Sequence, residues 1–320
     1  MAEWNVLDIE KPIGELDKQI EEIKRYSIEH SEDHSKDVEI LEFQRDELLK
    51  KVFGNLSTWD RVLLARHPKR PYTLDYVRML LDDYLEIHGD RLYADDNAMV
   101  CGIGKISGRK IAFVGQQKGR DLKDRQLRNF GSSKPEGYRK AMRVMKLAEK
   151  FNRPVICFVD TPAADCSVGS ESRGISEAIA RNMMEMSMLK CPVISIVIGE
   201  GGSGGAIGIA VANKVLMLEN SIYSVIPPEG CASILWRDKT KASDAAEALK
   251  ITAFHALELE VIDEVVNEPL GAAHRNAEET AKNIRNSLVK WIDVLSGMSR
   301  DELVSQRQDR FRNLGKFIEL

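Results

Sequence analysis

Apolar residues recur at helical spacing over the first part of the chain. Two runs, on either side of a polar break at residues 27–36, keep intervals of three, four or seven residues: Ile13, Leu16, Ile20 and Ile23, then Val38, Leu41, Leu48 and Val52. This spacing is typical of amphipathic helices, so residues 1–55 are predicted to form an antiparallel helical hairpin. Its apolar stripe serves either as an accessory packing surface or as the contact for a partner subunit, and the pattern leaves both open.

Further along, short apolar runs alternate with helical segments. The residues predicted as strands are 98–106 and 110–116, which form a hairpin around a Ser-Gly-Arg turn, then 154–160, 192–198, 215–218 and 222–225. The predicted helices are 73–88, 135–151, 173–189 and 206–212, followed by a mainly helical region from Ser243 whose last helix starts at a capping box, Ser299 with Glu302. Continuous apolar strands that alternate with helices predict an α/β fold with parallel pairing.

The strand predicted at 192–198 leads into a cluster of glycines. The cluster contains Gly199, Gly201, Gly202, Gly204 and Gly205, and the helix at 206–212 follows it. A strand that ends in a glycine turn and continues as a helix presents N–H groups without an internal partner, which can bind a phosphate or an oxyanion formed during a reaction. The spacing matches neither a P-loop nor the dinucleotide fingerprint. A tight strand–helix junction without a ligand is the alternative.

A second loop, residues 161–169, follows the strand at 154–160. Because the carboxyl ends of neighbouring parallel strands border one crevice, this loop and the glycine cluster are expected to face one pocket and to form an oxyanion hole there. Two unrelated surface loops are the alternative.

The sequence leaves other chemical roles open for residues near the glycine cluster and for a basic segment. Ser203 stands in a Gly-x-Ser-x-Gly pattern, with Asp263 and His274 following in the order that a hydrolase would need. Glu200 is either a general base or a carboxylate that fixes its loop. The basic residues within 118–125, interleaved with aspartates, either contact phosphates or form a solvated face.

Composition narrows the class of protein. With 320 residues, a net charge of −4 and a pI near 6.0, the chain is one large domain with appendages or two domains, and nucleic acid is an unlikely main partner. No apolar run reaches the roughly eighteen residues of a membrane helix, and the first residues lack the features of a signal peptide, so a cytoplasmic location is expected. The five cysteines form no C-x-x-C pair, which predicts free thiols and no zinc site in this chain.

A set of motifs spans nearly the whole chain: Arg66-His67-Pro68 with residues 70–77, Gly89-Asp90-Arg91 with residues 93–96, residues 117–120, 128–131 and 135–141, the glycine cluster with Ala206, and Pro228-Glu229-Gly230 with residues 231–236. Together they resemble the alpha subunit of bacterial acetyl-CoA carboxylase carboxyltransferase.

The resemblance implies a crotonase-like (ClpP/crotonase) α/β fold, a spiral of ββα units. It suggests a helical hairpin at 1–55 that contacts another subunit, a carboxyltransferase domain at 56–270 and C-terminal helices at 271–320. It also implies an α2β2 enzyme whose beta subunit carries zinc, acting with biotin carboxylase and the biotin carboxyl carrier protein in an ATP-binding complex. The implied reaction moves a carboxyl group from carboxybiotin to acetyl-CoA and gives malonyl-CoA for fatty acid synthesis.

The resemblance also suggests roles for single residues. The backbone N–H groups of Gly204, Gly205, Ala163 and Ala164 would form an oxyanion hole for the ureido oxygen of biotin. The residues expected to bind substrate are Glu200, Gly201, Gly202, Ser203, Arg173, Glu229 and Gly230. Biotin's own nitrogen would take the proton from acetyl-CoA, so no side-chain base is expected.

The loop at 161–169 departs from the family pattern. Ala163, Asp165, Cys166 and Ser167 stand where the family has Gly, Tyr, Pro and Gly; elsewhere Pro227 replaces a Ser and Ala272 a Gly. An alanine at positive φ in position 163 would cost about 1 kcal/mol. A charge on Asp165 would oppose the stabilisation that an oxyanion hole gives. A subunit that assembles but catalyses weakly or not at all, or one that acts on another acyl-CoA, is therefore the alternative.

Overall fold

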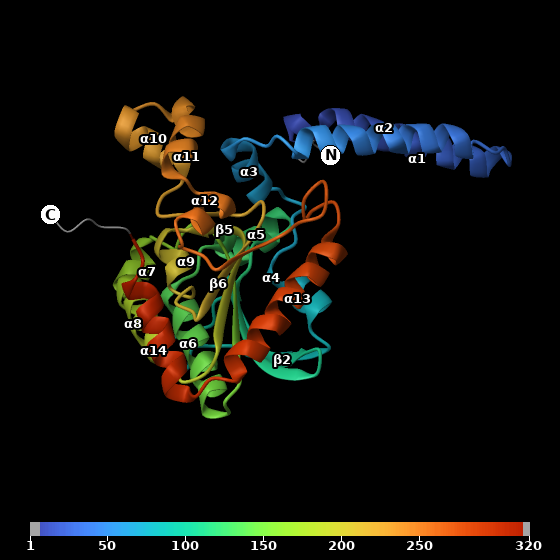
Figure 1. The fold of residues 1–320 in the computed structure, drawn as a ribbon. Coiled ribbons are helices and arrows are strands. Elements are labelled where there is room, and N and C mark those ends of the chain that lie inside the picture. Colours follow the sequence, from blue (N-terminus) through green and yellow to red (C-terminus); the bar gives the residue numbers. More distant parts are fainter. Residues whose placement is uncertain (1–6, 316–320) are drawn as a thin grey trace.

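A mixed eight-stranded sheet forms the centre of the chain, which is described here from a computed structural model covering residues 7–315 (Figure 1). The strands are β1 (Asp83–Glu86), β2 (Met99–Ile106), β3 (Arg109–Gln116), β4 (Val155–Thr161), β5 (Val193–Gly202), β6 (Lys214–Leu218), β7 (Ile222–Ser224) and β8 (Glu264–Val266). Their order is β1-β2-β3-β4-β5-β6-β8, and β7 pairs with the far end of β5. The pairs β1–β2 and β2–β3 are antiparallel, and all the others are parallel.

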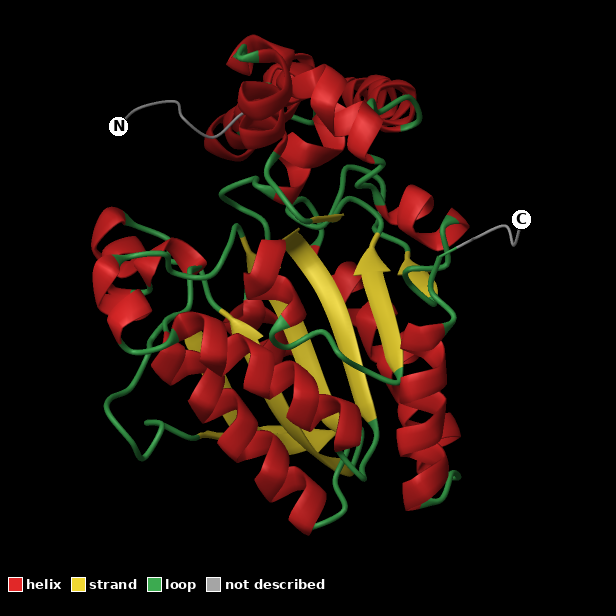
Figure 2. Ribbon diagram, turned by 90° about the vertical axis from the view of Figure 1, so that its left-hand side faces the viewer, coloured by secondary structure: helices red, strands yellow, loops and turns green. Residues whose placement is uncertain are grey.

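Helices cover both faces of the sheet, as Figures 1 and 2 show. They are η1 (Asp8–Glu10), α1 (Lys11–His30), α2 (Ser35–Phe53), α3 (Thr58–Ala65), α4 (Thr73–Leu80), α5 (Leu122–Leu127), η2 (Asn129–Gly131), α6 (Pro135–Lys150), α7 (Val168–Ser172), α8 (Ile175–Met188), α9 (Ser203–Ile207), α10 (Pro228–Trp236), η3 (Lys239–Lys241), α11 (Ala242–Leu249), α12 (Ala253–Glu258), α13 (Ala277–Ser296) and α14 (Arg300–Arg312). No helix in the described range is long and apolar enough to cross a membrane.

The central strands are buried on both faces. Along β4, Val155, Cys157 and Val159 pack into a core with α6 and α8, while Ile156 and Phe158 pack on the opposite face with α4 and α13. This alternation follows from the period of two along a strand. It explains why these strands read as continuous apolar runs.

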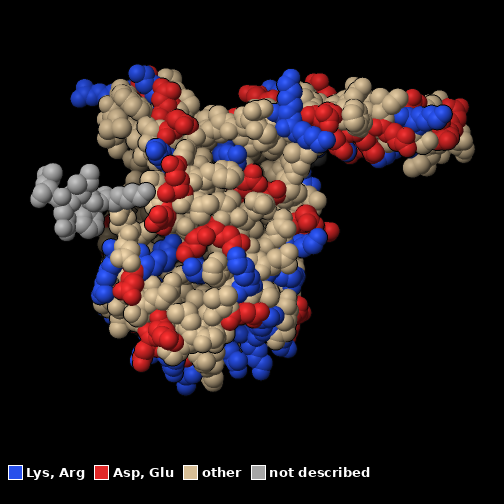
Figure 3. All heavy atoms as spheres, in the orientation of Figure 1, with Lys and Arg blue, Asp and Glu red and all other residues tan. Residues whose placement is uncertain are grey.

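The predicted helical hairpin is present as α1 and α2, and it projects from the body of the molecule (Figure 1). Its buried apolar residues are few, namely Ile13, Ile20, Val38 and Leu49, whereas Ile28, Ile40 and Phe43 are exposed by 81%, 57% and 68%. Lys and Arg atoms lie beside Asp and Glu atoms over the hairpin, with no large patch of one sign on the face that Figure 3 shows. The hairpin thus exposes apolar side chains within a surface of mixed charge.

The helix predicted at 73–88 is wrong in its second half. Helix α4 ends at Leu80, and residues 83–86 form the edge strand β1, which pairs with β2. Gly102 and Gly104 make this pairing possible, because a Cβ on either would lie 2.4 or 2.7 Å from a carbonyl oxygen of β1. Backbone pairing at the sheet edge overrides the helical spacing of Tyr76, Leu80 and Tyr84.

The helix predicted at 206–212 is also wrong. Strand β5 runs on through Gly202, since Gly201 pairs with Thr161 of β4 and with Tyr223 of β7. The helix that follows, α9, begins at Ser203, whose φ is +52°, and it ends at Ile207. Its five residues carry only a small dipole, so the N–H groups here act singly and not as the end of a long helix.

Candidate functional site

The structure brings the glycine cluster and the loop at 161–169 into direct contact. A Cβ on Gly205 would lie 2.7 Å from both the carbonyl carbon of Ala163 and the nitrogen of Ala164. A Cβ on Gly202 would lie 2.0 Å from the carbonyl oxygen of Pro162. Glycine is therefore required at both positions, because two backbones approach here without room for a side chain.

Four N–H groups at this contact are candidates for holding an anion. Within residues 7–315, the N–H groups of Gly204, Gly205, Ala163 and Ala164 donate no hydrogen bond. Gly205 is buried and the other three residues are half-buried, so a group of unpaired donors where two loops meet can hold a bound acceptor.

A mostly apolar cavity of about 290 Å³ opens beside Gly204, one of these four residues. It is lined by Ser203, Gly204, Ile207, Tyr223, Ser224, Val225 and Val261. Gly204 lies on this cavity, whereas Gly205 is buried against the facing loop. An apolar wall with a few backbone donors is typical of a small-molecule site.

The carbonyl side of α9 is anchored by buried polar side chains. The Gly205 carbonyl accepts hydrogen bonds from Gln116 Nε2 at 2.9 Å and from the Tyr138 hydroxyl at 3.3 Å. The Gly208 carbonyl accepts one from Asn182 Nδ2 at 3.1 Å. Sequence reasoning missed these anchors. The only signal was a glutamine at the end of an otherwise apolar strand.

Glu200 is held in place by charges on both sides. Its carboxylate accepts hydrogen bonds from Arg66 Nε at 2.6 Å and Lys118 Nζ at 2.7 Å, and Lys118 Nζ also lies 2.8 Å from Asp160 Oδ1. Burial opposes ionisation, but the charges of Lys118 and Arg66 outweigh it and lower the pKa of Glu200 to about 2. A general base working near neutrality needs a much higher pKa, so the geometry favours the loop-fixing role.

Glu229 belongs to the same network. It lies in the first turn of α10 beside Gly230 and accepts a hydrogen bond from Arg66 Nη1 at 2.5 Å. Arg66 thus links α10 to Glu200 and the glycine cluster. Sequence reasoning did not single out Arg66 as part of the site, although its motif was noted.

The Asp165 carboxylate is hydrogen-bonded within its own loop and the first turn of α7. Its carboxylate accepts hydrogen bonds from the hydroxyls of Ser167 at 2.7 Å and Ser170 at 2.5 Å, at the start of α7. Although burial opposes it, these hydrogen bonds lower the pKa of Asp165. The serine hydroxyls thus stabilise the charged carboxylate and hold it within its own loop.

The strain expected at Ala163 is absent. Among the described residues, the alanine with positive φ is Ala272, at +69°, and not Ala163. Ala163 is held instead by a hydrogen bond of 2.7 Å from the Thr161 hydroxyl to its carbonyl oxygen. The replacement that costs backbone energy therefore lies outside the loop that faces Gly205.

Arg173 lies in the turn between α7 and α8 and is occupied by other partners. Its Nε lies 2.5 Å from Glu136 Oε1, and its guanidinium lies 4.9 Å from the centre of the Tyr93 ring. These contacts tie α7 to α6. No recorded interaction among the described residues joins Arg173 to the glycine cluster.

The hydrolase alternative fails because its residues do not meet. Asp263 pairs with Lys214 at 2.9 Å and Arg310 at 3.0 Å. His274 Nε2 is hydrogen-bonded to Glu10 at 2.8 Å. Neither contacts Ser203 within the described part of the chain, so no Ser-His-Asp arrangement forms.

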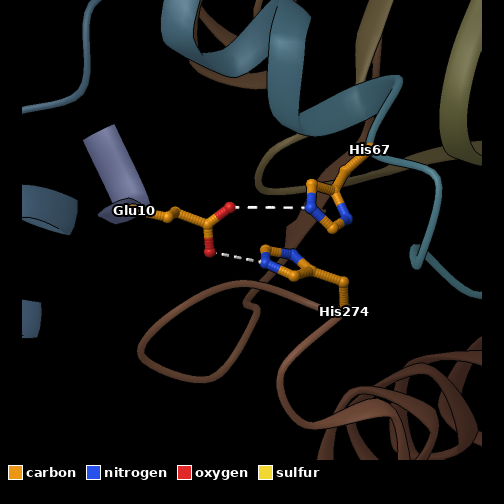
Figure 4. A group of neighbouring side chains, drawn as sticks. All are labelled: Glu10, His67 and His274. Carbon is orange, nitrogen blue, oxygen red and sulfur yellow. Dashed lines mark hydrogen bonds and ion pairs between the residues drawn. The ribbon is translucent and has the colours of Figure 1, made fainter. Parts of the chain in front are cut away.

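One group of described residues has the spacing of metal ligands: Glu10, His67 and His274, which Figure 4 shows side by side. All three side chains are at most 5% exposed. His67 Nδ1 accepts the N–H of Lys69 at 3.2 Å, which leaves the proton of a neutral ring on Nε2, 3.6 Å from Glu10 Oε2.

The two rings lie 3.9 Å apart with planes 31° from parallel, and each turns a nitrogen toward a different oxygen of Glu10. Burial opposes ionisation of Glu10, but the hydrogen bond from His274 and the nearby positive charges lower its pKa. The arrangement fits a carboxylate held between two imidazoles better than a metal centre. It fixes the start of the N-terminal hairpin to two distant loops.

Comparisons with known proteins agree with this architecture. Residues 6–315 match the family described as acetyl co-enzyme A carboxylase carboxyltransferase-like. The chain is 51% identical over 314 residues to acetyl-coenzyme A carboxylase carboxyl transferase subunit alpha from Staphylococcus aureus, in strains bovine RF122 / ET3-1 and MRSA252. Each match covers 98% of this chain and 100% of the relative.

Solved structures with a similar fold are more distant in sequence. Transcarboxylase 12S aligns with a TM-score of 0.58 at 18% identity, over 71% of this chain and 42% of that one. The beta subunit of P. aeruginosa geranyl-CoA carboxylase aligns with a TM-score of 0.56 at 16% identity, over 83% of this chain and 48% of that one. The expected crotonase-like fold is confirmed by these carboxyltransferase neighbours.

Proposed function

Because the chain belongs to the family of acetyl-CoA carboxylase carboxyltransferase alpha subunits, we propose that it works with a beta subunit to move a carboxyl group from carboxybiotin to acetyl-CoA, forming malonyl-CoA. Family membership rests on 51% identity over 98% of the chain. The observation in the structure that supports the site is the meeting of two loops whose N–H groups are unpaired.

The residues present fit a bound biotin. Gly204 lines an apolar cavity of about 290 Å³, and the unpaired N–H groups of Gly205, Ala163 and Ala164 belong to the same contact between the two loops. When bound, biotin would supply the carboxyl group and a ureido oxygen that becomes negative as that group leaves. The four backbone donors would hold that oxygen, and the buried anchors of α9 would keep them in place without reorganisation.

The side chains around the site have supporting roles in this proposal. Glu200 lies between Gly199 and Gly201, and its hydrogen bonds with Lys118 and Arg66 fix the end of β5. Arg66 also donates a hydrogen bond to Glu229 in α10. We therefore assign Glu229 and Gly230 to the wall of the site. Ser203 and Ile207 line the cavity and exclude water from it.

The proposal extends to the assembly. We place the chain in a cytoplasmic α2β2 heterotetramer in which the beta subunit carries zinc and binds acetyl-CoA. The biotin carboxyl carrier protein and biotin carboxylase would be further partners in an ATP-binding complex for fatty acid synthesis. The exposed apolar residues of the hairpin, such as Ile28 and Phe43, supply a surface for the subunit contact.

The decisive experiment is an assay of the chain co-purified with its beta partner. We expect malonyl-CoA to form from acetyl-CoA and carboxybiotin, and a panel of longer acyl-CoA thioesters to react more slowly. A properly assembled complex with no turnover would refute the proposal, and faster carboxylation of another thioester would correct its substrate.

The departures at 163–167 have their own test. Because hydrogen bonds from Ser167 and Ser170 hold the Asp165 carboxylate within its own loop, the double change Ala163→Gly with Asp165→Tyr is expected to leave turnover within a few-fold of the unchanged complex. A large gain in turnover would instead show that this subunit is the weakly active form of its family.

A further inference from the structure

Gln116 lies between the two loops of the site, and both ends of its side-chain amide are used. It is fully buried at the last position of β3. Its Oε1 accepts the N–H of Asp160 at 3.1 Å, and its Nε2 donates to the carbonyl of Gly205 at 2.9 Å. One side chain therefore bonds the backbone that leads into the 161–169 loop and the backbone of α9.

The pairing of β4 with β5 explains why this bond is needed. The register of the two strands shifts between Val159 and Thr161, so Asp160 stands at an irregularity in the ladder. Gln116 accepts the hydrogen bond from the Asp160 N–H, which has no partner in the β4–β5 ladder. The carboxylate of Asp160 in turn accepts the N–H of Glu200 at 3.0 Å, which links the amide to the start of the glycine cluster.

The orientation of the amide is fixed by its partners. A backbone N–H must meet the amide oxygen and a backbone carbonyl must meet the NH₂ group, so the reversed amide would lose both bonds. The Tyr138 hydroxyl also donates to the Gly205 carbonyl, at 3.3 Å, but it does not contact Asp160. Gln116 thus bonds the backbone of both halves, which the Tyr138 side chain does not.

We infer that Gln116 is a positioning residue that sets the distance and orientation between the two groups of N–H donors, and so controls how well they hold a negatively charged oxygen. This inference rests on the proposed carboxyl transfer. Preorganised donors act on the transition state more than on substrate binding, so Gln116 governs kcat and leaves the KM for acetyl-CoA unchanged.

The test uses Gln116→Glu in the complete complex. The new carboxylate keeps the size of the amide and can still accept the Asp160 N–H, but it places negative charge against the Gly205 carbonyl. When protonated, the same carboxyl group donates a hydrogen bond there as the amide did. Burial and the neighbouring Asp160 carboxylate both favour protonation of this new group. Burial raises the pKa of Tyr138, and Asp160 and Glu200 outweigh burial to raise the pKa of Lys118, so both keep their protons between pH 6 and pH 8.

We expect Gln116→Glu to lower kcat at least tenfold at pH 8, to recover several-fold relative to the unchanged complex between pH 8 and pH 6, and to keep its KM for acetyl-CoA within twofold. Gln117→Glu is the matched control, because Gln117 is also buried but bonds the N–H of Leu74 and the carbonyl of Lys118 instead. An equal loss in both variants, or a loss carried by KM, would overturn the inference.

Amide hydrogen exchange of the complex without substrates gives a readout that is independent of turnover. Peptides covering residues 161–165 and 203–208 should exchange faster in Gln116→Glu than in Gln117→Glu at pH 8. Should the charged variant fail to assemble, Gln116→Met removes both bonds without adding charge. We expect the same loss of kcat, the same KM and the same faster exchange from it, but no recovery between pH 8 and pH 6. Altered exchange with no turnover in the unchanged complex would uphold the coupling and refute carboxyl transfer; unaltered exchange would refute the coupling.

Discussion

Replacing Lys118 with methionine tests whether the charged network holds the glycine cluster in place. The ammonium of Lys118 lies 2.8 Å from Asp160 Oδ1 and 2.7 Å from Glu200 Oε2, and its side chain is only 13% exposed. Lys118→Met keeps much of the side-chain volume but leaves two neighbouring carboxylates to face each other. Arg66 remains in contact with Glu200.

The size of the effect follows from the pKa of Glu200. A decrease from 4.5 to about 2 corresponds to about 3 kcal/mol of stability, since one pKa unit equals about 1.36 kcal/mol. Lys118 and Arg66 share this stabilisation. Adding the new repulsion between Asp160 and Glu200, we expect Lys118→Met to lower the free energy of unfolding by about 3 kcal/mol, in the range measured when one partner of a buried pair is removed.

The pH dependence distinguishes this mechanism from a loss of packing. In the unchanged chain, the depressed pKa of Glu200 contributes stability that is fully present above pH 4.5 and is lost as the pH falls toward 2. In Lys118→Met, one carboxylate gains a raised pKa, so protonation relieves the repulsion. The difference in stability between the two proteins should therefore be larger at pH 8 than at pH 5.

Urea unfolding followed by tryptophan fluorescence at both pH values measures this difference. Lys110→Met is the matched control, because Lys110 is exposed on β3 and forms no ion pair within the described residues. The control should change the unfolding free energy by less than about 0.5 kcal/mol. A loss below about 1 kcal/mol for Lys118→Met, or one that is equal at both pH values, would refute the reasoning.

Three further predictions concern the same region and its surroundings. N-ethylmaleimide should modify Cys166, the exposed cysteine, before the four buried ones, and it should slow turnover in the unchanged complex but not in Cys166→Ser; mass spectrometry and the malonyl-CoA assay check both points. Gly205→Ala should lower turnover more than a hundredfold, because its Cβ would meet the Ala163 carbonyl carbon at 2.7 Å, whereas Gly14→Ala, which meets nothing within 4 Å, should leave turnover unchanged. Ala272→Gly should raise the free energy of unfolding by about 1 kcal/mol by removing the strain of φ +69°, and an unchanged urea midpoint would contradict this.

Periodicity along the chain predicted the elements whose environment is decided locally. The helical hairpin, the β2–β3 hairpin and the buried strands β4 and β5 all follow from the spacing of apolar residues, because spacing records which side chains face the core. The contact between the 161–169 loop and the glycine cluster followed from a topological rule for parallel strands. These features needed no knowledge of distant partners.

Other features depend on contacts between distant segments, and local patterns do not record those. Strand β1 exists because β2 offers an edge with two glycines, so the sequence at 83–86 alone favoured a helix. Gln116 bonds Asp160 and Gly205, which lie 44 and 89 positions away, and no local signal links them.

The carboxylate held between two imidazoles also sets an order of events during synthesis. Glu10 and His274 are 264 positions apart, so at about 5–20 residues per second a ribosome takes roughly 13–53 s to add the second after the first. For most of that interval the hairpin helices and His67 have already been made, while the loop that carries His274 has not. The part of the chain that leaves the ribosome first is therefore among the last to reach its final position.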